Sequence, residues 1–538
     1  MSETPVTPTH PKRIDWMEWA AVAAILLLFA WARWDVRPTP SPQYPGRFGP
    51  PARAGMSAPP SMDEVWHLAL STGRGRAIEV PFNVLLPDLP AWTSLRDAPP
   101  WYRVWTTLGG VVHPPLYAQT LRIWRAIFGD GDLAATAYSL AWSLAALFAT
   151  YAAARLALPR GAAFWIGALA AVAPTGVYLS IEIRGYAMAA GLGAGLALVV
   201  AASRRFGVTW RVCAALAILL LLSMLTHYFA AGTCLAAAGV TLATARRGER
   251  WRVVAAVAGA AAVYALVWLP FAIEQSRLLG GLQYLQADAD AWPVLAGKGL
   301  MLPLRALQDW RGWPTPVMWL LGTAAFAGPV LVARRHRALW PFAAMSVVGC
   351  GLLLAQNMLQ GVRVVAFIRY AAPVTAVSIL AVAGAAYFLL RRLHPAVPHV
   401  VLGAAVVGWC AFPPPAIVTD SPRFGTIGQA LAPRLSPEET IVIYAQPEMS
   451  YLPWGTLLEF THLPGVFPRD AMLLNRPLSP AELGQFRGRV AWLILLTPAR
   501  PEELLPGARV EDATLVPIGG DVPGTRPDRY PALRVALP

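Results

Sequence analysis

The chain has 538 residues, of which 56% are hydrophobic and only 14% are charged, and its mean hydropathy is +0.48. This composition excludes a set of soluble domains and indicates a polytopic membrane protein. The formal net charge of +14 comes with arginines in short clusters between apolar segments, without a Lys/Arg-rich arm interleaved with aromatic residues. Nucleic acid is therefore not an expected partner.

The first apolar segment runs from Trp16 to Trp34, directly after Lys12 and Arg13. It has about the ~20 residues that cross a bilayer, and it ends in Trp and Arg rather than at a small-residue cleavage site. We therefore predict an uncleaved membrane anchor, with residues 1–15 in the cytoplasm.

Ten further apolar segments of roughly transmembrane length follow the anchor. They lie near residues 133–158, 162–179, 186–203, 211–226, 228–245, 251–272, 315–333, 339–356, 370–390 and 398–415. About eleven transmembrane helices are thus expected within residues 16–415. The polar turn at Thr226, His227 and Tyr228 is expected to divide one long apolar run into two of these spans.

Basic residues fall in alternate loops between the segments. They are Arg155 and Arg160; Arg204, Arg205 and Arg211; Arg246, Arg247, Arg250 and Arg252; Arg334, Arg335 and Arg337; Arg391 and Arg392. The positive-inside rule places these loops in the cytoplasm. The other side then carries a large first loop (35–132), the turn at 180–185, the His227 turn, and the tail.

The tail over residues 420–538 is expected to form a small α/β domain outside the membrane. Its apolar runs "TIVIYA" from Thr440 and "VAWLILL" from Val490 are typical of buried strands, and Pro/Gly-rich turns separate them. The length suits one small domain. No catalytic motif is recognisable in it.

Acidic residues are scarce in the first loop, yet "SMDEVWHLAL" places two carboxylates beside a histidine. If this stretch begins a helix, Asp63 and His67 lie four residues apart on one face. Ser61 would then be the N-cap and Glu64 would complete a capping box, which gives Glu64 a purely structural alternative. That alternative does not account for Asp63 and His67 together.

The same loop continues with "HPPLYAQTLRIWRAIFGDGD", in which a proline pair follows His113. Proline is well suited to the first turn of a helix, and the pattern that follows indicates an amphipathic helix in the membrane interface. Its expected apolar face carries Leu116, Leu121, Trp124, Ile127 and Phe128, against Gln119, Arg122 and Arg125. His113 would stand at its N-terminus.

A third polar group lies in "SIEIRGYAMAAGL", where Glu182 and Arg184 stand between two spans. Ionisable groups at membrane depth are costly and indicate a functional site, although an ion pair on a surface loop is the alternative. His227 in "LTHYFAAG" and Arg369 in "FIRYAAP" also stand at outer span ends. Aromatic belts and snorkelling arginines are ordinary there, so each is weak by itself.

Taken in order, "DEVWH", "HPPLYAQTLRIWRAIFGDGDLAA", "EIRGYAM", "THYF" and "RYAAP" resemble the GT-C glycosyltransferases. The similarity is to the family 39-like branch, which includes protein O-mannosyltransferases and lipid A aminoarabinose transferases, and it covers roughly residues 15–390. It implies a GT-C-like membrane enzyme that transfers a sugar from a polyprenyl-phosphate donor to a lipid, glycan or protein acceptor.

The resemblance also implies roles for individual residues. Asp63 corresponds to the family's general base, with Glu64 as its catalytic neighbour, and Arg184, His113 and Arg369 are candidates for binding the donor phosphate. The remaining candidates, which would assist the substrate or a metal, are Glu182, His67 and His227. One departure is that Thr136 and Tyr138 stand where many relatives have an arginine and a proline.

Arginine suits a phosphate leaving group because its planar guanidinium can bind two oxygens. The acidic and histidine side chains could also hold a divalent ion, but no tight ligand motif is present and no cofactor is certain.

The rival interpretation is a transporter or flippase for a lipid-linked or anionic substrate, which predicts mid-span charges and internal repeats. The Arg/Ala/Gly/Pro-rich composition is typical of bacteria and suggests a cell-envelope enzyme of the plasma (inner) membrane, its active site facing the periplasm or cell exterior.

Overall fold

A computed structural model describes most of the helical part of the chain and parts of the tail. The described residues are 16–34, 62–75, 80–87, 92–108, 111–279, 292–309, 314–360, 364–411, 431, 434–436, 438–445, 457, 470–486, 488–517 and 529–537. Ser61, the expected N-cap, lies outside them. Asp63 lies within a described helix, but its side chain is outside the described part.

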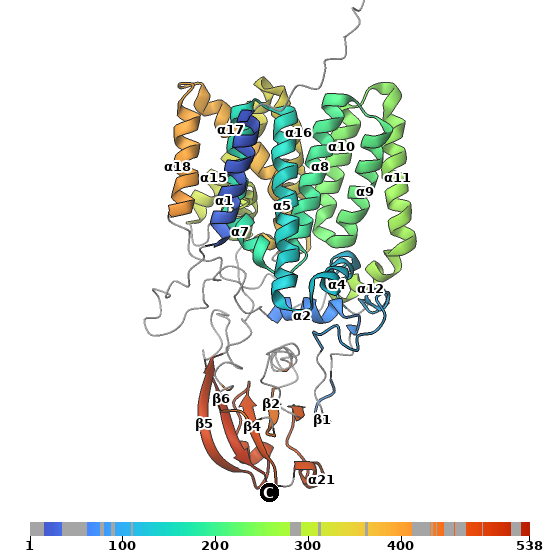
Figure 1. Ribbon diagram of the computed structural model, residues 1–538, viewed down its shortest axis with the longest axis vertical. Coiled ribbons are helices and arrows are strands. Elements are labelled where there is room, and N and C mark those ends of the chain that lie inside the picture. Colours follow the sequence, from blue (N-terminus) through green and yellow to red (C-terminus); the bar gives the residue numbers. More distant parts are fainter. Residues whose placement is uncertain are drawn as a thin grey trace, which may run out of the picture.

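The larger part of the molecule is a helical bundle, as predicted (Figure 1). Its main helices are α1 (Trp16–Trp34), α5 (Asp132–Ala157), α6 (Arg160–Val172), α7 (Pro174–Ile181), α8 (Tyr186–Phe206), α9 (Trp210–Thr226), α10 (Ala231–Thr244), α11 (Arg250–Val267), α15 (Thr315–Arg335), α16 (Trp340–Gln360), α17 (Thr375–Arg391) and α18 (Val397–Ala411). Shorter helical segments join them: η4 (Tyr228–Ala230), α12 (Leu269–Leu279), α13 (Trp292–Leu300), α14 (Leu302–Arg305), η8 (Val364–Ala366) and η9 (Ile368–Val374).

Within the described residues, seven helices are long and apolar enough to cross a membrane, or up to eight if α6 and α7 form one span bent by 50°. Three shorter apolar helices, α9, α10 with η4, and α18, would complete the eleven spans expected. The predicted turn at His227 is confirmed, because α9 ends at Thr226 and the chain reverses into η4 and α10.

The arginine-rich loops lie together at one end of the bundle. Arg155 and Arg160 both pair with Glu18 at the start of α1, and the guanidinium of Arg204 donates to the carbonyl of Arg337. These contacts join loops that the sequence places on one side. In Figure 1 the sheet of the tail lies beyond the opposite end, which agrees with the predicted alternation.

Two helices of the first loop cross that opposite end of the bundle (Figure 1). They are α2 (Met62–Ser71) and α4 (Pro115–Phe128), with the short α3 (Arg103–Thr106) between them. Helix α4 begins with proline at its first position, as expected, because the missing proline N–H would have no partner there in any helix.

Five strands of the tail and one of the first loop form a mixed sheet in the order β1-β3-β2-β4-β6-β5. The strands are β1 (Leu85–Pro87), β2 (Thr440–Tyr444), β3 (Asp470–Leu474), β4 (Val490–Leu495), β5 (Arg509–Pro517) and β6 (Arg529–Ala536), with the short helices α21 (Pro480–Leu483) and α22 (Pro501–Leu504). The two expected strands are confirmed as β2 and β4, which pair in parallel. Strand β1 was not expected, because it comes from the first loop and pairs antiparallel with β3.

Helix α2 packs between the sheet and the bundle. Val65 and Ala69, one turn apart, belong to the apolar core formed with Ile441 of β2 and Trp492 of β4. Leu68 packs instead against a separate cluster of the bundle that includes residues of α4 and α5. The position of α2 is therefore fixed from both sides.

Candidate functional site

Glu64 connects the first loop to the turn between α7 and α8. Its side chain is 2% exposed, and its Oε1 accepts a hydrogen bond of 2.8 Å from the backbone N–H of Ile183. These two residues are 119 positions apart in the chain. The contact brings α2, which also carries Asp63 and His67, against the turn that carries Glu182 and Arg184.

The charged residues of this turn are buried. Glu182, Arg184 and Arg369 are between 2% and 6% exposed, which excludes an ion pair on a solvent-exposed loop. Burial raises the pKa of Glu182, while the charges of Arg184 and Arg369 lower it and that of Glu64 raises it. Two acidic and two basic groups thus interact electrostatically at one end of the bundle.

Backbone contacts hold the turn in place. The carbonyl of Glu182 accepts a hydrogen bond of 2.5 Å from Ser139 Oγ on α5 and one of 2.8 Å from the N–H of Arg184. At Gly185, a Cβ would lie 3.3 Å from the ring of Tyr117, so a larger residue would press on α4. The turn is therefore packed closely against both α4 and α5.

A pocket opens beside the turn, and its lining includes His67, His113, Tyr117, Gly185, Tyr186 and His227. The ring centroids of His67 and His113 are 4.8 Å apart, and those of Tyr186 and His227 are 5.4 Å apart. The three predicted histidines, two from the first loop and one from the His227 turn, are thus brought together around one pocket.

Aromatic rings and guanidinium groups form one side of the site. His227 lies 6.1 Å from Tyr370 and 5.1 Å from Phe229, measured between ring centroids. The guanidinium of Arg184 lies 4.9 Å from the centroid of Tyr186, and that of Arg369 lies 5.4 Å from that of Tyr370. Such cation–π contacts stabilise positive charge where little water reaches it.

His227 is held in its neutral form. Burial, together with the nearby His113 and the charge of Arg184, lowers its pKa to about 3. A neutral imidazole has one donor nitrogen and one acceptor nitrogen. His227 can therefore bind a hydroxyl group but cannot contribute positive charge near pH 7.

This shift predicts a pH-dependent loss of stability. The unfolded chain binds a proton at His227 below about pH 6.5, whereas the folded chain does so only near pH 3, so acid favours unfolding by about 1.4 kcal/mol per pH unit between these values. We expect the melting temperature of the wild type in detergent to fall more between pH 7 and pH 5 than that of His227→Gln. Equal falls in the two proteins would contradict the assignment.

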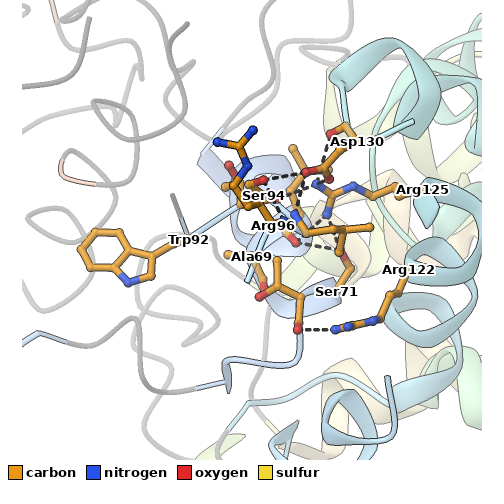
Figure 2. Close-up of polar contacts among 12 residues, drawn as sticks. Ala69, Ser71, Trp92, Ser94, Arg96, Arg122, Arg125 and Asp130 are labelled. Carbon is orange, nitrogen blue, oxygen red and sulfur yellow. Dashed lines mark hydrogen bonds and ion pairs between the residues drawn. The ribbon is translucent and has the colours of Figure 1, made fainter. Parts of the chain in front are cut away.

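Arg125 of α4 anchors the C-terminal end of α2, as Figure 2 shows. Its Nη1 donates to Ser71 Oγ at 2.6 Å and to the carbonyl of Leu68 at 3.1 Å, and its Nη2 pairs with Asp130. The last carbonyls of a helix have no partner within it, and a cation there also interacts favourably with the helix dipole. Asp130 in turn accepts hydrogen bonds from Ser94 Oγ and from the N–H of Leu95.

Helix α4 buries part of its polar side in protein. Gln119 and Arg125 are buried against the protein, whereas Ile127 and Phe128 are 68% and 60% exposed. Arg122 is also directed inward and donates to the carbonyls of Thr72 and Pro99. Because the first loop presents backbone carbonyls to α4, arginines satisfy them better than apolar side chains would.

Several residues of the site were missed from the sequence. Tyr117, Tyr186 and Tyr370 line or flank the pocket, and each lies within or beside a motif singled out above. Tyr138, one of the two departures from the family pattern, donates to Thr120 Oγ1 at 2.5 Å and packs on Tyr117. The tyrosines within these three motifs were the available signal, but aromatic residues at span ends have an ordinary interfacial role.

Among the side chains that the structure describes, no group of three or more His, Cys, Asp or Glu could hold a metal ion. The rings of His67 and His113 are tilted by 53° to each other.

No family model and no curated protein matches the chain. Among solved structures it is similar to apo ArnT from Cupriavidus metallidurans, at 13% identity and a TM-score of 0.41, over 96% of this chain and 97% of that one. It is also similar to the apo oligosaccharyltransferase of Archaeoglobus fulgidus, at 12% identity and a TM-score of 0.44, over 88% of this chain and 66% of that one.

A third similar structure is arabinofuranosyltransferase AftD from Mycobacteria, at 18% identity and a TM-score of 0.36, over 97% of this chain and 41% of that one. All three are GT-C glycosyltransferases, the superfamily that the sequence motifs resemble. Because these identities and TM-scores are low, the functional proposal rests on the site itself.

Proposed function

We propose that the protein is a membrane glycosyltransferase that moves a sugar from a polyprenyl-phosphate donor to an acceptor hydroxyl. The observation that carries this proposal is the hydrogen bond from Ile183 to Glu64. It joins the helix of Asp63 to the turn of Arg184 at one end of the bundle.

In the proposed reaction, the oxygen of the acceptor hydroxyl attacks the anomeric carbon of the donor sugar. The bond between that carbon and the phosphate oxygen breaks, and polyprenyl phosphate leaves with the electron pair. Asp63 takes the proton of the hydroxyl; α2 places it one turn before His67, which lines the pocket. The products are the glycosylated acceptor and polyprenyl phosphate.

Arg184 and Arg369 are proposed to stabilise the charge that develops on the departing phosphate. Both are buried, so their interaction with an anion would be screened little by water. Burial raises the pKa of Glu182, and the charges of both arginines oppose this rise. Glu182 is proposed to hold the two arginines when no donor is bound. Glu64 is proposed to position the turn rather than to exchange a proton.

Of the three histidines, one is proposed to bind the donor phosphate and two to bind uncharged parts of the substrate. His113 stands just before α4, where the helix N-terminus favours an anion, so it is assigned to the donor phosphate. His67 and His227 line the same pocket and are assigned to sugar or acceptor hydroxyls. On the predicted topology, this pocket faces the periplasm or cell exterior of a bacterial plasma membrane, with the donor's lipid tail between the spans.

The test is the release of free polyprenyl phosphate from a panel of labelled polyprenyl-phosphate sugars, by membranes that contain the wild type or Asp63→Asn. Cell-envelope extract supplies the acceptor. We expect release from at least one donor by the wild type and a loss of about 10²–10⁴-fold in the variant, the usual contribution of a general base.

Equal release by the two proteins would overturn the role of Asp63. If no donor is cleaved but one crosses the membrane in the presence of the wild type, the protein is instead a transporter or flippase, the rival predicted from the sequence.

A further inference from the structure

Arg33 is a buried cation in the last turn of α1, far in sequence from the residues assigned above. Its side chain is 7% exposed, and its guanidinium lies 3.5 Å from the ring centroid of Phe29. Its Nε donates to Ser180 Oγ at 2.9 Å, and its Nη1 donates to the carbonyls of Ala171 at 2.8 Å and Phe29 at 3.0 Å. Among the described residues it forms no ion pair with a carboxylate.

The contact with Ala171 lies where α6 and α7 are bent by 50°. In an unbroken helix that carbonyl would accept from the N–H of Thr175, but this N–H donates to the carbonyl of Leu307 instead. A carbonyl freed within a membrane must be satisfied by protein, because no water is available there. Arg33 supplies that donor.

Arg33 also holds the far end of α7 through Ser180, which is two residues before Glu182. A single side chain at the end of α1 therefore contacts both sides of the break. A long planar guanidinium with several donors can span this distance, whereas an aliphatic side chain would leave both acceptors unsatisfied.

The opposite side of α7 is held by α14. Thr175 Oγ1 donates to the carbonyl of Arg305 at 2.7 Å, and the guanidinium of Arg305 donates to the carbonyls of Val365 and Ala366. Ala366 is three residues before Arg369. The break is thus connected to both segments that carry the buried arginines of the site.

We infer that Arg33 is a positioning residue. It fixes the bend between α6 and α7 and thereby determines the position of the turn that carries Glu182 and Arg184. Its hydrogen bonds and its ring contact reach neither the pocket-lining residues nor the charged residues Glu64, Glu182, Arg184 and Arg369. The inference deepens the proposed function and rests on it for its effect on transfer, but its structural part can be measured separately.

The test compares Arg33→Met with Arg155→Met in protein purified and kept in lipid nanodiscs. Arg155 also joins α1 to the bundle, through Glu18, but at the other end and without contact to α7. We expect at least a tenfold rise in amide hydrogen exchange across residues 181–186 in Arg33→Met only, and a fall of about 10- to 100-fold in transfer, since misplacement of about 1 Å can cost this much.

Two further variants separate positioning from general loss of structure. Arg33→Lys keeps one donor for Ala171 and should recover part of both effects. Thr175→Val removes the hydroxyl contact to α14 and should raise exchange in the same segment. Unchanged exchange over 181–186 in folded Arg33→Met, or a rise spread over the whole bundle, would overturn the inference. A wild type without transferase activity would refute the proposed function but leave the exchange result to decide the role of Arg33.

Discussion

Replacing Arg184 by methionine is expected to reduce sugar transfer by about 10²–10³-fold, the usual loss when one preorganised donor to a developing anion is removed. Arg184 is 5% exposed and acts on both Glu182 and His227 electrostatically. Its charge is therefore available in a site where water screens it little. The measurement is kcat with a cleavable polyprenyl-phosphate sugar, after folding has been checked by the melting temperature.

The matched control is Arg204→Met. Arg204 also lies at a helix end and bonds a backbone carbonyl, but at the opposite end of the bundle. Arg184→Lys should retain part of the activity, because an ammonium supplies the charge without the planar pair of donors. Equal kcat in Arg184→Met and Arg204→Met would remove Arg184 from the site.

The second large effect is expected on stability. Arg125→Met should lower the free energy of unfolding by about 3 kcal/mol, because it removes the ion pair with Asp130 and the hydrogen bonds to Ser71 Oγ and to the carbonyl of Leu68. Asp130 is 35% exposed, which places the expected cost at the lower end for a broken buried pair. The shift in melting temperature of the purified protein measures it.

Arg122→Met is the matched control, because Arg122 lies about one turn before Arg125 in the same helix. It also donates to backbone carbonyls of the first loop but is only partly buried and is not paired with a carboxylate among the described residues (Figure 2). A smaller shift is therefore expected. If both variants melted alike, the Arg125–Asp130 pair would not be what holds α2 against α4.

The bundle was largely predictable because hydrophobic length and arginine placement depend on local sequence and on the membrane. The turn at His227, which only three polar or aromatic residues mark, was found because the alternation of arginine loops required it. Strand β1 was missed because it has three residues, ends in proline, and forms only by pairing with β3, almost four hundred residues later.

The site was predictable as a set of residues but not as a geometry. Composition and order singled out Glu64, Glu182 and Arg184, yet the contact of Glu64 with Ile183 depends on how two distant loops pack. The burial of Gln119 and Arg125 on α4 was not foreseen for the same reason. A helix pattern shows which residues share a face, but whether that face meets lipid or the carbonyls of another loop is decided by tertiary packing.

The central claim is that this protein breaks the bond between sugar and phosphate rather than carrying the intact donor across a membrane. It is tested most directly with a donor labelled separately on the sugar and on the phosphate, added to sealed liposomes that contain the purified protein and an acceptor. The two labels should separate with the wild type, the sugar moving to the acceptor, and should stay together with Asp63→Asn. Labels that reach the other leaflet still joined, with the wild type and the variant alike, would contradict the account.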